Sequence, residues 1–160
     1  MKTKNILCAI AAASLVVLTS SCNKVSPVIP AAEKLAGTYS GDCSLTVMGS
    51  TSEDVCTFVI KKIDDSNISI TTPEAGSGAM ALPSITVENI PASKTTIDGV
   101  ELNKAYVAAV SGTITVDGAE KSYNFTELNI VGDGEKVSIT YNLQYGKMPM
   151  AMAFEFTGTK

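Results

Sequence analysis

The sequence predicts an all-β protein, a single up-and-down antiparallel β-barrel of about eight strands. Two observations carry this prediction. Apolar and polar residues alternate in short segments from residue 38 onward, which is the pattern of strands with one buried face. Glycine, aspartate, asparagine and serine separate most of these segments, and short connections of this kind join neighbouring antiparallel strands. No segment after residue 36 has the apolar spacing of a long helix.

The N-terminus, residues 1–21, is predicted to be a secretion signal. Lys2 and Lys4 precede an apolar run from Ile6 to Leu18, which is short for a membrane-spanning helix. The small residues before Cys22 resemble the lipobox of bacterial lipoproteins, in which the cysteine is acylated and becomes the first residue. Leucine usually stands three places before that cysteine, whereas Leu18 stands four places before Cys22.

The lipobox resemblance implies that Cys22 is lipidated and that the mature protein has a membrane as its partner. Asn23 would be the second residue, as in lipoproteins that are sorted to the outer membrane. We therefore expect secretion across the inner membrane and lipid anchoring in the cell envelope, with the leaflet and facing left open. The alternative is an ordinary cleaved signal peptide that leaves Cys22 as a free thiol, a reactive liability outside the cell.

Removal of the signal leaves residues 22–160, which suffice for one domain. Residues 22–34 are rich in proline and alanine and are predicted to form a tether. A helical turn from Ala31 to Leu35 is expected to close the tether. The barrel domain is predicted to span residues 35–160.

Turn residues divide the barrel domain into strands, for example Gly49-Ser50, Asp64 to Asn67 and Asp117-Gly118. Asp64, Asp65 and Asn67 also offer oxygens to calcium, but the spacing of a calcium-binding loop is absent, so we interpret them as turn residues. The expected strands are Thr38 to Val47, Val55 to Ile63, Ile68 to Thr72, Ala81 to Glu88, Tyr106 to Val116, Lys121 to Val131, Lys136 to Tyr145 and Met150 to Gly158.

The region from Pro73 to Asn103 is less regular than the rest of the domain. It contains Pro83, Pro91 and a glycine-rich stretch, Gly76 to Gly78, and a proline within a strand removes a donor from the ladder. We expect long loops, a sheet edge or a lid in this region.

The sixth strand has an irregular apolar pattern. Its apolar phase changes after Phe125, so we expect a β-bulge at Thr126-Glu127 that bends the strand. Across the Asp117-Gly118 turn, Gly112 is expected to face Phe125 and to leave room for its ring.

The last two strands are expected to form a hairpin around Gly146-Lys147, a pair suited to a tight turn with glycine first. A two-residue turn opposes Tyr145 to Met148, and Tyr141 to Met152. Every opposed pair on that face is apolar. The register is therefore strongly specified, because a one-residue slip would turn a whole row of apolar side chains to water.

Four segments of the mature chain, Leu35 to Gly41, Leu45 to Gly49, Leu82 to Val87 and Phe154 to Lys160, resemble the calycin-like β-barrel domain family of bacterial lipoproteins. The resemblance covers nearly all of the mature chain, and its motifs are structural rather than catalytic. It implies a lipocalin-like barrel that binds a small apolar or amphipathic molecule. In contrast to true lipocalins, no helix is expected after the last strand.

Cys43 and Cys56 lie on the two strands that flank Gly49-Ser50. If that turn has two residues, the cysteines oppose each other where a cross-strand disulfide is feasible. A longer loop would oppose Cys43 to Ile60 and leave the thiols too far apart to bridge. An oxidising compartment favours a structural disulfide over two buried thiols.

The last hairpin carries the best candidates for a ligand surface, namely Tyr141, Tyr145, Met148, Met150, Met152 and Phe154. Methionine adapts its shape and tyrosine adds a polar group, which suits a pocket for a flexible apolar molecule. Alternatively these side chains fill the barrel, because an eight-stranded barrel is either packed solid or holds one small ligand. We expect packing for most of them and expect Tyr145 and Met148 to reach an open mouth.

No sequence motif indicates catalysis. The chain has no nucleophile elbow, no phosphate-binding loop and no histidine. We therefore expect no enzyme, no catalytic residue, no cofactor and no metal site. Nucleic acid is not expected as a partner, because the net charge is −4 and arginine is absent.

The favoured function is a non-enzymatic envelope lipoprotein that binds a small hydrophobic or amphipathic ligand in the barrel. The alternative is a protein-binding module, such as an envelope enzyme inhibitor or an adhesion subunit, that uses loops between Pro73 and Asn103. An enzyme with a carboxylate site is a third hypothesis.

Overall fold

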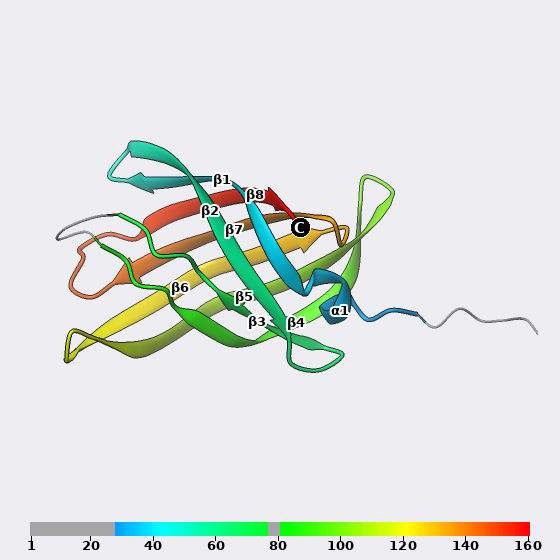
Figure 1. The fold of residues 1–160 in the computed structure, drawn as a ribbon, viewed down its shortest axis with the longest axis horizontal. Coiled ribbons are helices and arrows are strands. Elements are labelled where there is room, and N and C mark those ends of the chain that lie inside the picture. The colour runs from blue at the N-terminus through cyan, green and yellow to red at the C-terminus, as the bar shows by residue number, and fades with distance from the viewer. Residues whose placement is uncertain (1–27, 77–80) are drawn as a thin grey trace, which may run out of the picture.

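A computed structural model describes residues 28–76 and 81–160, and the predicted signal and Cys22 lie outside the described residues. One short helix precedes eight strands that form a closed antiparallel barrel in the order of the sequence (Figure 1). The elements are α1 (Ala31–Leu35), β1 (Gly37–Val47), β2 (Ser50–Lys62), β3 (Asn67–Thr71), β4 (Thr86–Ile97), β5 (Val100–Val116), β6 (Ala119–Gly132), β7 (Lys136–Tyr145) and β8 (Met152–Thr159). This confirms the predicted up-and-down barrel. In the part of the chain that the structure describes, no helix is long and apolar enough to cross a membrane.

The interior of the barrel is filled by side chains. Phe58 from β2 is fully buried and lies 5.7 Å from Phe154 and 4.7 Å from Phe156, between ring centroids. Tyr141 stacks on Phe154 at 5.0 Å. The core consists of residues from Ala32 to Phe156, so a chain that begins at Lys24 contains every residue that the core uses. An eight-stranded barrel with this many inward aromatic rings is packed rather than hollow.

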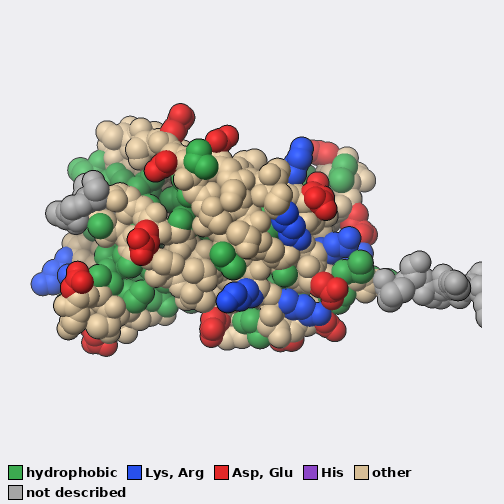
Figure 2. Space-filling model, viewed as in Figure 1, with side chains coloured by type: hydrophobic (Ala, Val, Ile, Leu, Met, Phe, Trp, Pro, Cys, Tyr) green, Lys and Arg blue, Asp and Glu red, His purple; other side chains and the backbone are tan. Residues whose placement is uncertain are grey.

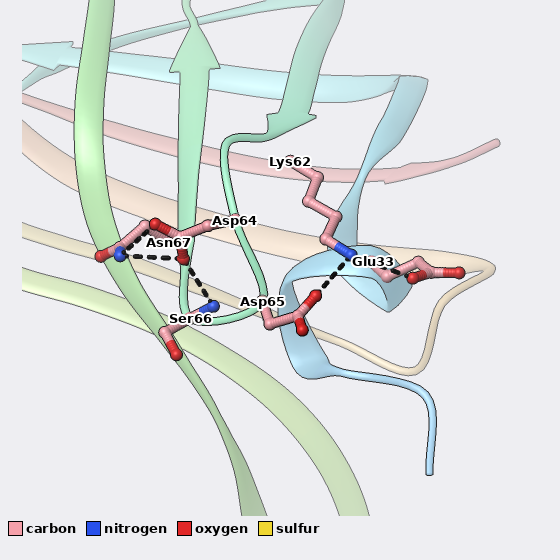
Figure 3. A network of polar contacts seen from close by, with 6 residues as sticks. All are labelled: Glu33, Lys62, Asp64, Asp65, Ser66 and Asn67. Carbon is pink, nitrogen blue, oxygen red and sulfur yellow. Dashed lines mark hydrogen bonds and ion pairs between the residues drawn. The ribbon is translucent and has the colours of Figure 1, made fainter. Parts of the chain in front are cut away.

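Helix α1 covers one end of the barrel. Its Leu35 and Ala32 are fully buried, and the carbonyl of Leu35 accepts a hydrogen bond of 3.0 Å from the Tyr39 hydroxyl. Lys62 on β2 pairs with Glu33 of α1 at 3.1 Å and with Asp65 at 2.7 Å (Figure 3). Residues 31–34, which we expected to end the tether, therefore belong to the closed end of the barrel.

The turn between β2 and β3 is held by its own side chains. Asp64 accepts hydrogen bonds from the Ser66 backbone N–H at 2.7 Å and from the Asn67 amide at 2.9 and 3.0 Å (Figure 3). These hydrogen bonds hold the pKa of Asp64 below its ordinary value. The interpretation of these residues as turn residues rather than calcium ligands agrees with this geometry.

The expectation of loops between Pro73 and Asn103 is wrong for the second half of that region. Strand β4 runs through Pro91 to Ile97 and turns at Asp98-Gly99, where both residues have positive φ, as a type I′ hairpin requires. The predicted strand began five residues too early, at Ala81. Pro91 is tolerated because it lies beside an irregularity of β4, where Asn89 has a φ of 58° and the register between β3 and β4 shifts by one residue.

Strands β4 and β5 pair over part of their length. The pairs run from Ala92 with Ala105 to Ile97 with Val100. Beyond Ala105, the described pairing of β5 is with β6 alone. The barrel wall is therefore closed between β4 and β5 near the end covered by α1.

The β-bulge in β6 is confirmed. The register with β7 shifts between Thr126 and Asn129, and Glu127 has a φ of 53°. The pairing of Gly112 with Phe125 is wrong, because β5 and β6 pair up to the two turn residues and Gly112 faces Tyr123. A Cβ on Gly112 would lie 2.5 Å from the Tyr123 hydroxyl, so this glycine does leave room for a ring, that of Tyr123.

Candidate functional site

The connection between β7 and β8 forms the predicted turn and then departs from the prediction. Gly146 has a φ of 60°, and the Met148 N–H donates to the Tyr145 carbonyl at 3.2 Å. Strand β8 nevertheless begins only at Met152. Pro149 has no N–H for a ladder bond, and the segment from Met148 to Ala151 leaves the sheet. In the structure, the tight turn is thus followed by a short loop from Met148 to Ala151 that lies outside the sheet.

The register of the last hairpin is consequently displaced by two residues. Tyr141 faces Phe154, not Met152, and Leu143 faces Met152. Because side chains alternate with a period of two, this displacement keeps the apolar residues of the paired segments on their predicted face, whereas Met148 and Met150 lie outside the sheet. The strand faces were therefore predicted correctly and the pairing was not.

The six predicted ligand residues separate into two groups. Tyr141, Met152 and Phe154 are buried in the barrel core. Tyr145, Met148 and Met150 instead line a pocket at one end of the barrel. Tyr145 is 8% exposed and Met150 is 54% exposed, so the pocket has a buried floor and an open rim.

This mouth pocket is formed where three connections meet. It has a volume of about 420 Å³ and is lined by Val47, Met48, Lys121, Tyr145, Gly146, Lys147, Met148, Pro149 and Met150. The lining comes from the end of β1 and its turn, the start of β6, and the β7–β8 connection. Figure 2 shows apolar side chains gathered at the end of the molecule away from α1. The pocket is thus an apolar concavity opposite the closed end.

Two lysines of the mouth pocket, Lys121 and Lys147, are not among the predicted ligand residues. Lys121 lies two residues before Tyr123 on β6 and faces Ile114 of β5, so it occupies the apolar phase of its strand. Lys147 is the second residue of the tight turn. The sequence does show a lysine at a strand position that alternates with Tyr123 and Phe125, where an apolar residue is expected. Only the fold brings this lysine into the same pocket as Lys147.

Cys43 and Cys56 are close to each other but not directly opposed. The β1–β2 turn is Met48-Gly49, with φ values of 50° and 83°, so Cys43 pairs with Asp54 and Cys56 with Gly41. Both expected registers are wrong. The structure holds the two cysteines as free thiols, and the disulfide stays a prediction.

The thiol environment disfavours a reactive thiolate. Burial, a hydrogen bond with Cys43 and the charge of Asp54 all raise the pKa of Cys56 above its ordinary value. Burial likewise raises the pKa of Tyr141. Within residues 28–76 and 81–160, no three His, Cys, Asp or Glu side chains gather as a metal site would require.

A larger groove of about 620 Å³ runs over the outer surface of β8, β1 and β2. Its lining includes four carboxylates, Asp42, Glu53, Asp54 and Glu155. The described lining of this groove contains no lysine and none of the six predicted ligand residues. We therefore take the mouth pocket as the candidate site.

Comparison with known proteins gives a family and one structural neighbour. Residues 35–159 match the family described as the calycin-like beta-barrel domain. A crystal structure of a putative outer membrane protein from Bacteroides fragilis NCTC 9343 is similar, with a TM-score of 0.59 and 24% sequence identity. The similarity covers 82% of this chain and 53% of the neighbour, so the chain spans about half of the neighbour's length. No curated protein matches the sequence.

Proposed function

Because the chain belongs to the calycin-like β-barrel domain family, we propose that it is a lipid-anchored envelope protein that binds a small apolar or amphipathic molecule. The observation that carries the proposal is the mouth pocket, an apolar concavity of about 420 Å³ opposite α1. Pockets for small ligands usually measure about 300–1,000 Å³ and are mostly apolar with a few polar groups. The mouth pocket has that size and that mixture.

The packed interior determines where the ligand binds. Phe58, Phe125 and Phe156 are almost completely buried inside the barrel, and they leave the mouth as the place for a guest molecule. Methionine side chains at the rim adapt to guests of different shape. Tyr145 supplies a rigid ring at the floor.

The proposed anchor is the lipid on Cys22, at the start of the tether. The lipobox-like residues before Cys22 support it, and so does the name of the structural neighbour, which refers to the outer membrane. The proposal of a non-enzymatic role is supported by the absence of histidine from the sequence and by the raised pKa of Cys56.

Native mass spectrometry of residues 24–160, secreted in the protein's own host behind a cleavable signal peptide, isolated from the envelope and compared with the denatured mass, tests ligand binding. We expect a reproducible mass excess that disappears on denaturation. A Met148→Gln/Met150→Gln variant should show a smaller mass excess. The control Thr113→Gln, at an exposed position of β5 outside the pocket, should leave the mass excess unchanged. A native mass equal to that of the bare chain would refute the ligand.

A separate experiment tests the anchor. The full chain is expressed in a bacterium and extracted from membranes with detergent, beside a Cys22→Ala variant. We expect the mass of the processed chain to exceed that of residues 22–160 by a diacylglyceryl group and acyl chains. The variant should appear in the soluble fraction. An unmodified Cys22 thiol in the mature protein would contradict the proposal.

A protein-binding module is the second candidate, and one observation favours it. The interior is packed, while Met48 is 76% exposed and Met150 is 54% exposed. Exposed methionines are common at adaptable protein-binding surfaces. A native complex that contains a second protein, and loses it when Met48 and Met150 are replaced by glutamine, would favour this candidate over a small ligand.

A further inference from the structure

The position of Lys121 is unusual for a barrel strand. Lys121, Tyr123 and Phe125 share one face of β6, and Phe125 is completely buried in the core. Lys121 faces Ile114 across the hairpin. A charged side chain in this phase is kept out of the core and extends toward water along apolar surface. It therefore presents a positive charge at the edge of the mouth pocket, whose lining includes it.

Lys147 adds a second positive charge to the same pocket. The described residues that line it include no aspartate or glutamate, and neither lysine makes an ion pair within the described ranges. The protein as a whole is acidic, with a formal charge of −4, and the groove on β8, β1 and β2 is lined by four carboxylates. The described lining of the mouth pocket thus carries positive charge and no carboxylate, in contrast to the acidic groove.

The mouth pocket is lined by apolar side chains as well as by the two lysines. Met48, Met148 and Met150 supply flexible thioether chains, and Pro149 and Tyr145 supply rigid apolar area. An alkyl chain fits this lining, and each methylene that is fully removed from water increases affinity about fourfold. An anionic group at the end of that chain is complementary to the two lysines.

We propose that the ligand of the mouth pocket is a free anionic amphiphile, a molecule with one alkyl chain against the methionines and a carboxylate, sulfate or phosphate between Lys121 and Lys147. This inference rests on the proposed function, because it names the chemical class of the ligand of the same site. It commits to a free molecule rather than to a lipid within a membrane, because the mouth lies opposite α1 and the start of the described chain (Figure 1).

The test uses residues 24–160 with ¹³C-labelled methionine methyl groups and three probes, decanoate, 1-decanol and decyltrimethylammonium. The two ionic probes are kept below their micellar concentrations and 1-decanol below its solubility limit. We expect decanoate to shift the methyl signals of Met48, Met148 and Met150 in a saturable way. The methyl of Met152, which is buried in the core, serves as the reference for an intact fold. The decanoate affinity should fall as salt rises, because exposed charges are screened.

Replacement of both lysines separates charge from apolar contact. In Lys121→Gln/Lys147→Gln we expect about a tenfold loss of decanoate affinity, on the scale of two exposed charge pairs, and no change for decanol. The matched control is Lys61→Gln/Lys136→Gln, which removes the same net charge at two exposed positions outside the pocket. The control should bind decanoate as the unmodified protein does.

The outcomes distinguish the two proposals. If decanoate and decanol bind equally well and the lysine variant changes neither, the anionic class is refuted and the small-ligand function stands. If no probe moves the methyl signals of Met48, Met148 and Met150, both are refuted. Sedimentation of the domain with phosphatidylglycerol vesicles, lost in the Lys121→Gln/Lys147→Gln variant, would replace the free amphiphile by a membrane surface.

Discussion

Replacing Phe58 with alanine is the most direct test of the packed barrel. Phe58 is fully buried and its ring lies within 4.7–6.4 Å of the rings of Tyr141, Phe154 and Phe156. The neighbours come from β7 and β8, across the barrel interior, and cannot collapse onto the vacated space without moving their strands. We expect a loss of about 3–5 kcal/mol in the free energy of unfolding. The melting temperature should fall by about 10–20 °C for a domain of this size.

The assay is urea unfolding of residues 24–160, with Tyr106→Ala as the matched control. Tyr106 is 37% exposed, and its hydroxyl donates to Glu127 at 2.8 Å, so its removal should cost less than about 1.5 kcal/mol. The Phe58→Ala protein should also regain stability in the presence of benzene, since an apolar cavity of this kind binds it. A cost below about 1 kcal/mol for Phe58→Ala, with no effect of benzene, would mean that the interior is not packed around this ring.

The remaining predictions concern pH, thiol chemistry and a close strand contact. The pKa of Asp64 is lowered in the folded state. Its carboxylate therefore stabilises the fold above the unfolded pKa of 3.8, and this stabilisation is lost as the pH falls toward the lower folded pKa. In urea titrations from pH 7 to 2.5, the free energy of unfolding should fall less on acidification in Asp64→Ala than in the unmodified chain. The pKa of Cys56 is raised, so in the reduced protein iodoacetamide should alkylate it at pH 8 much more slowly than in urea, and equal rates would contradict its burial. A Cβ on Gly41 would clash with the backbone of Thr157 and Gly158, so Gly41→Ala should destabilise the domain by about 1–3 kcal/mol in the same unfolding assay. In the control Gly118→Ala, no atom lies within 4 Å of the added Cβ but φ is positive, so the cost should be about 1 kcal/mol.

Sequence patterns were sufficient for the faces of the strands. The alternation around Tyr141 and Phe154 placed both on the buried face, where the structure has them. The change of phase after Phe125 located the bulge at Thr126-Glu127, which the register shift confirms. These signals are local, because each depends only on neighbouring residues along one strand.

The strand registers were harder to predict for a physical reason. A displacement by two residues preserves every inward and outward position, so the pairings of Tyr141 with Met152 and of Gly112 with Phe125 were both compatible with the apolar pattern. The turn chemistry of Met48-Gly49 and the missing N–H of Pro149 decide the actual registers.

The candidate site was predicted only in part. Tyr145 and Met148 were expected at the mouth because they flank a turn, and the structure has them there. Lys121 was missed, because its proximity to Lys147 follows from the pairing of β6 with β7 and from no local pattern. The part of strand β4 after Glu88 was missed, because Pro91 is compatible with a strand only beside an irregularity that the sequence does not reveal.

The short pairing between β4 and β5 has a consequence for how the barrel opens. Six residue pairs, from Ala92 with Ala105 to Ile97 with Val100, join these strands, whereas thirteen pairs join β5 to β6. After Ala105, every second backbone N–H of β5 points away from β6, toward the side on which β4 pairs with the first part of β5. Among the described residues, no strand pairs with these N–H groups. Such amides exchange with solvent through local fluctuations, whereas core amides of β6 and β7 require global unfolding. Partial opening between β4 and β5 would leave β1 paired with β8, so the barrel would unroll into one open sheet with β4 and β5 at its two edges.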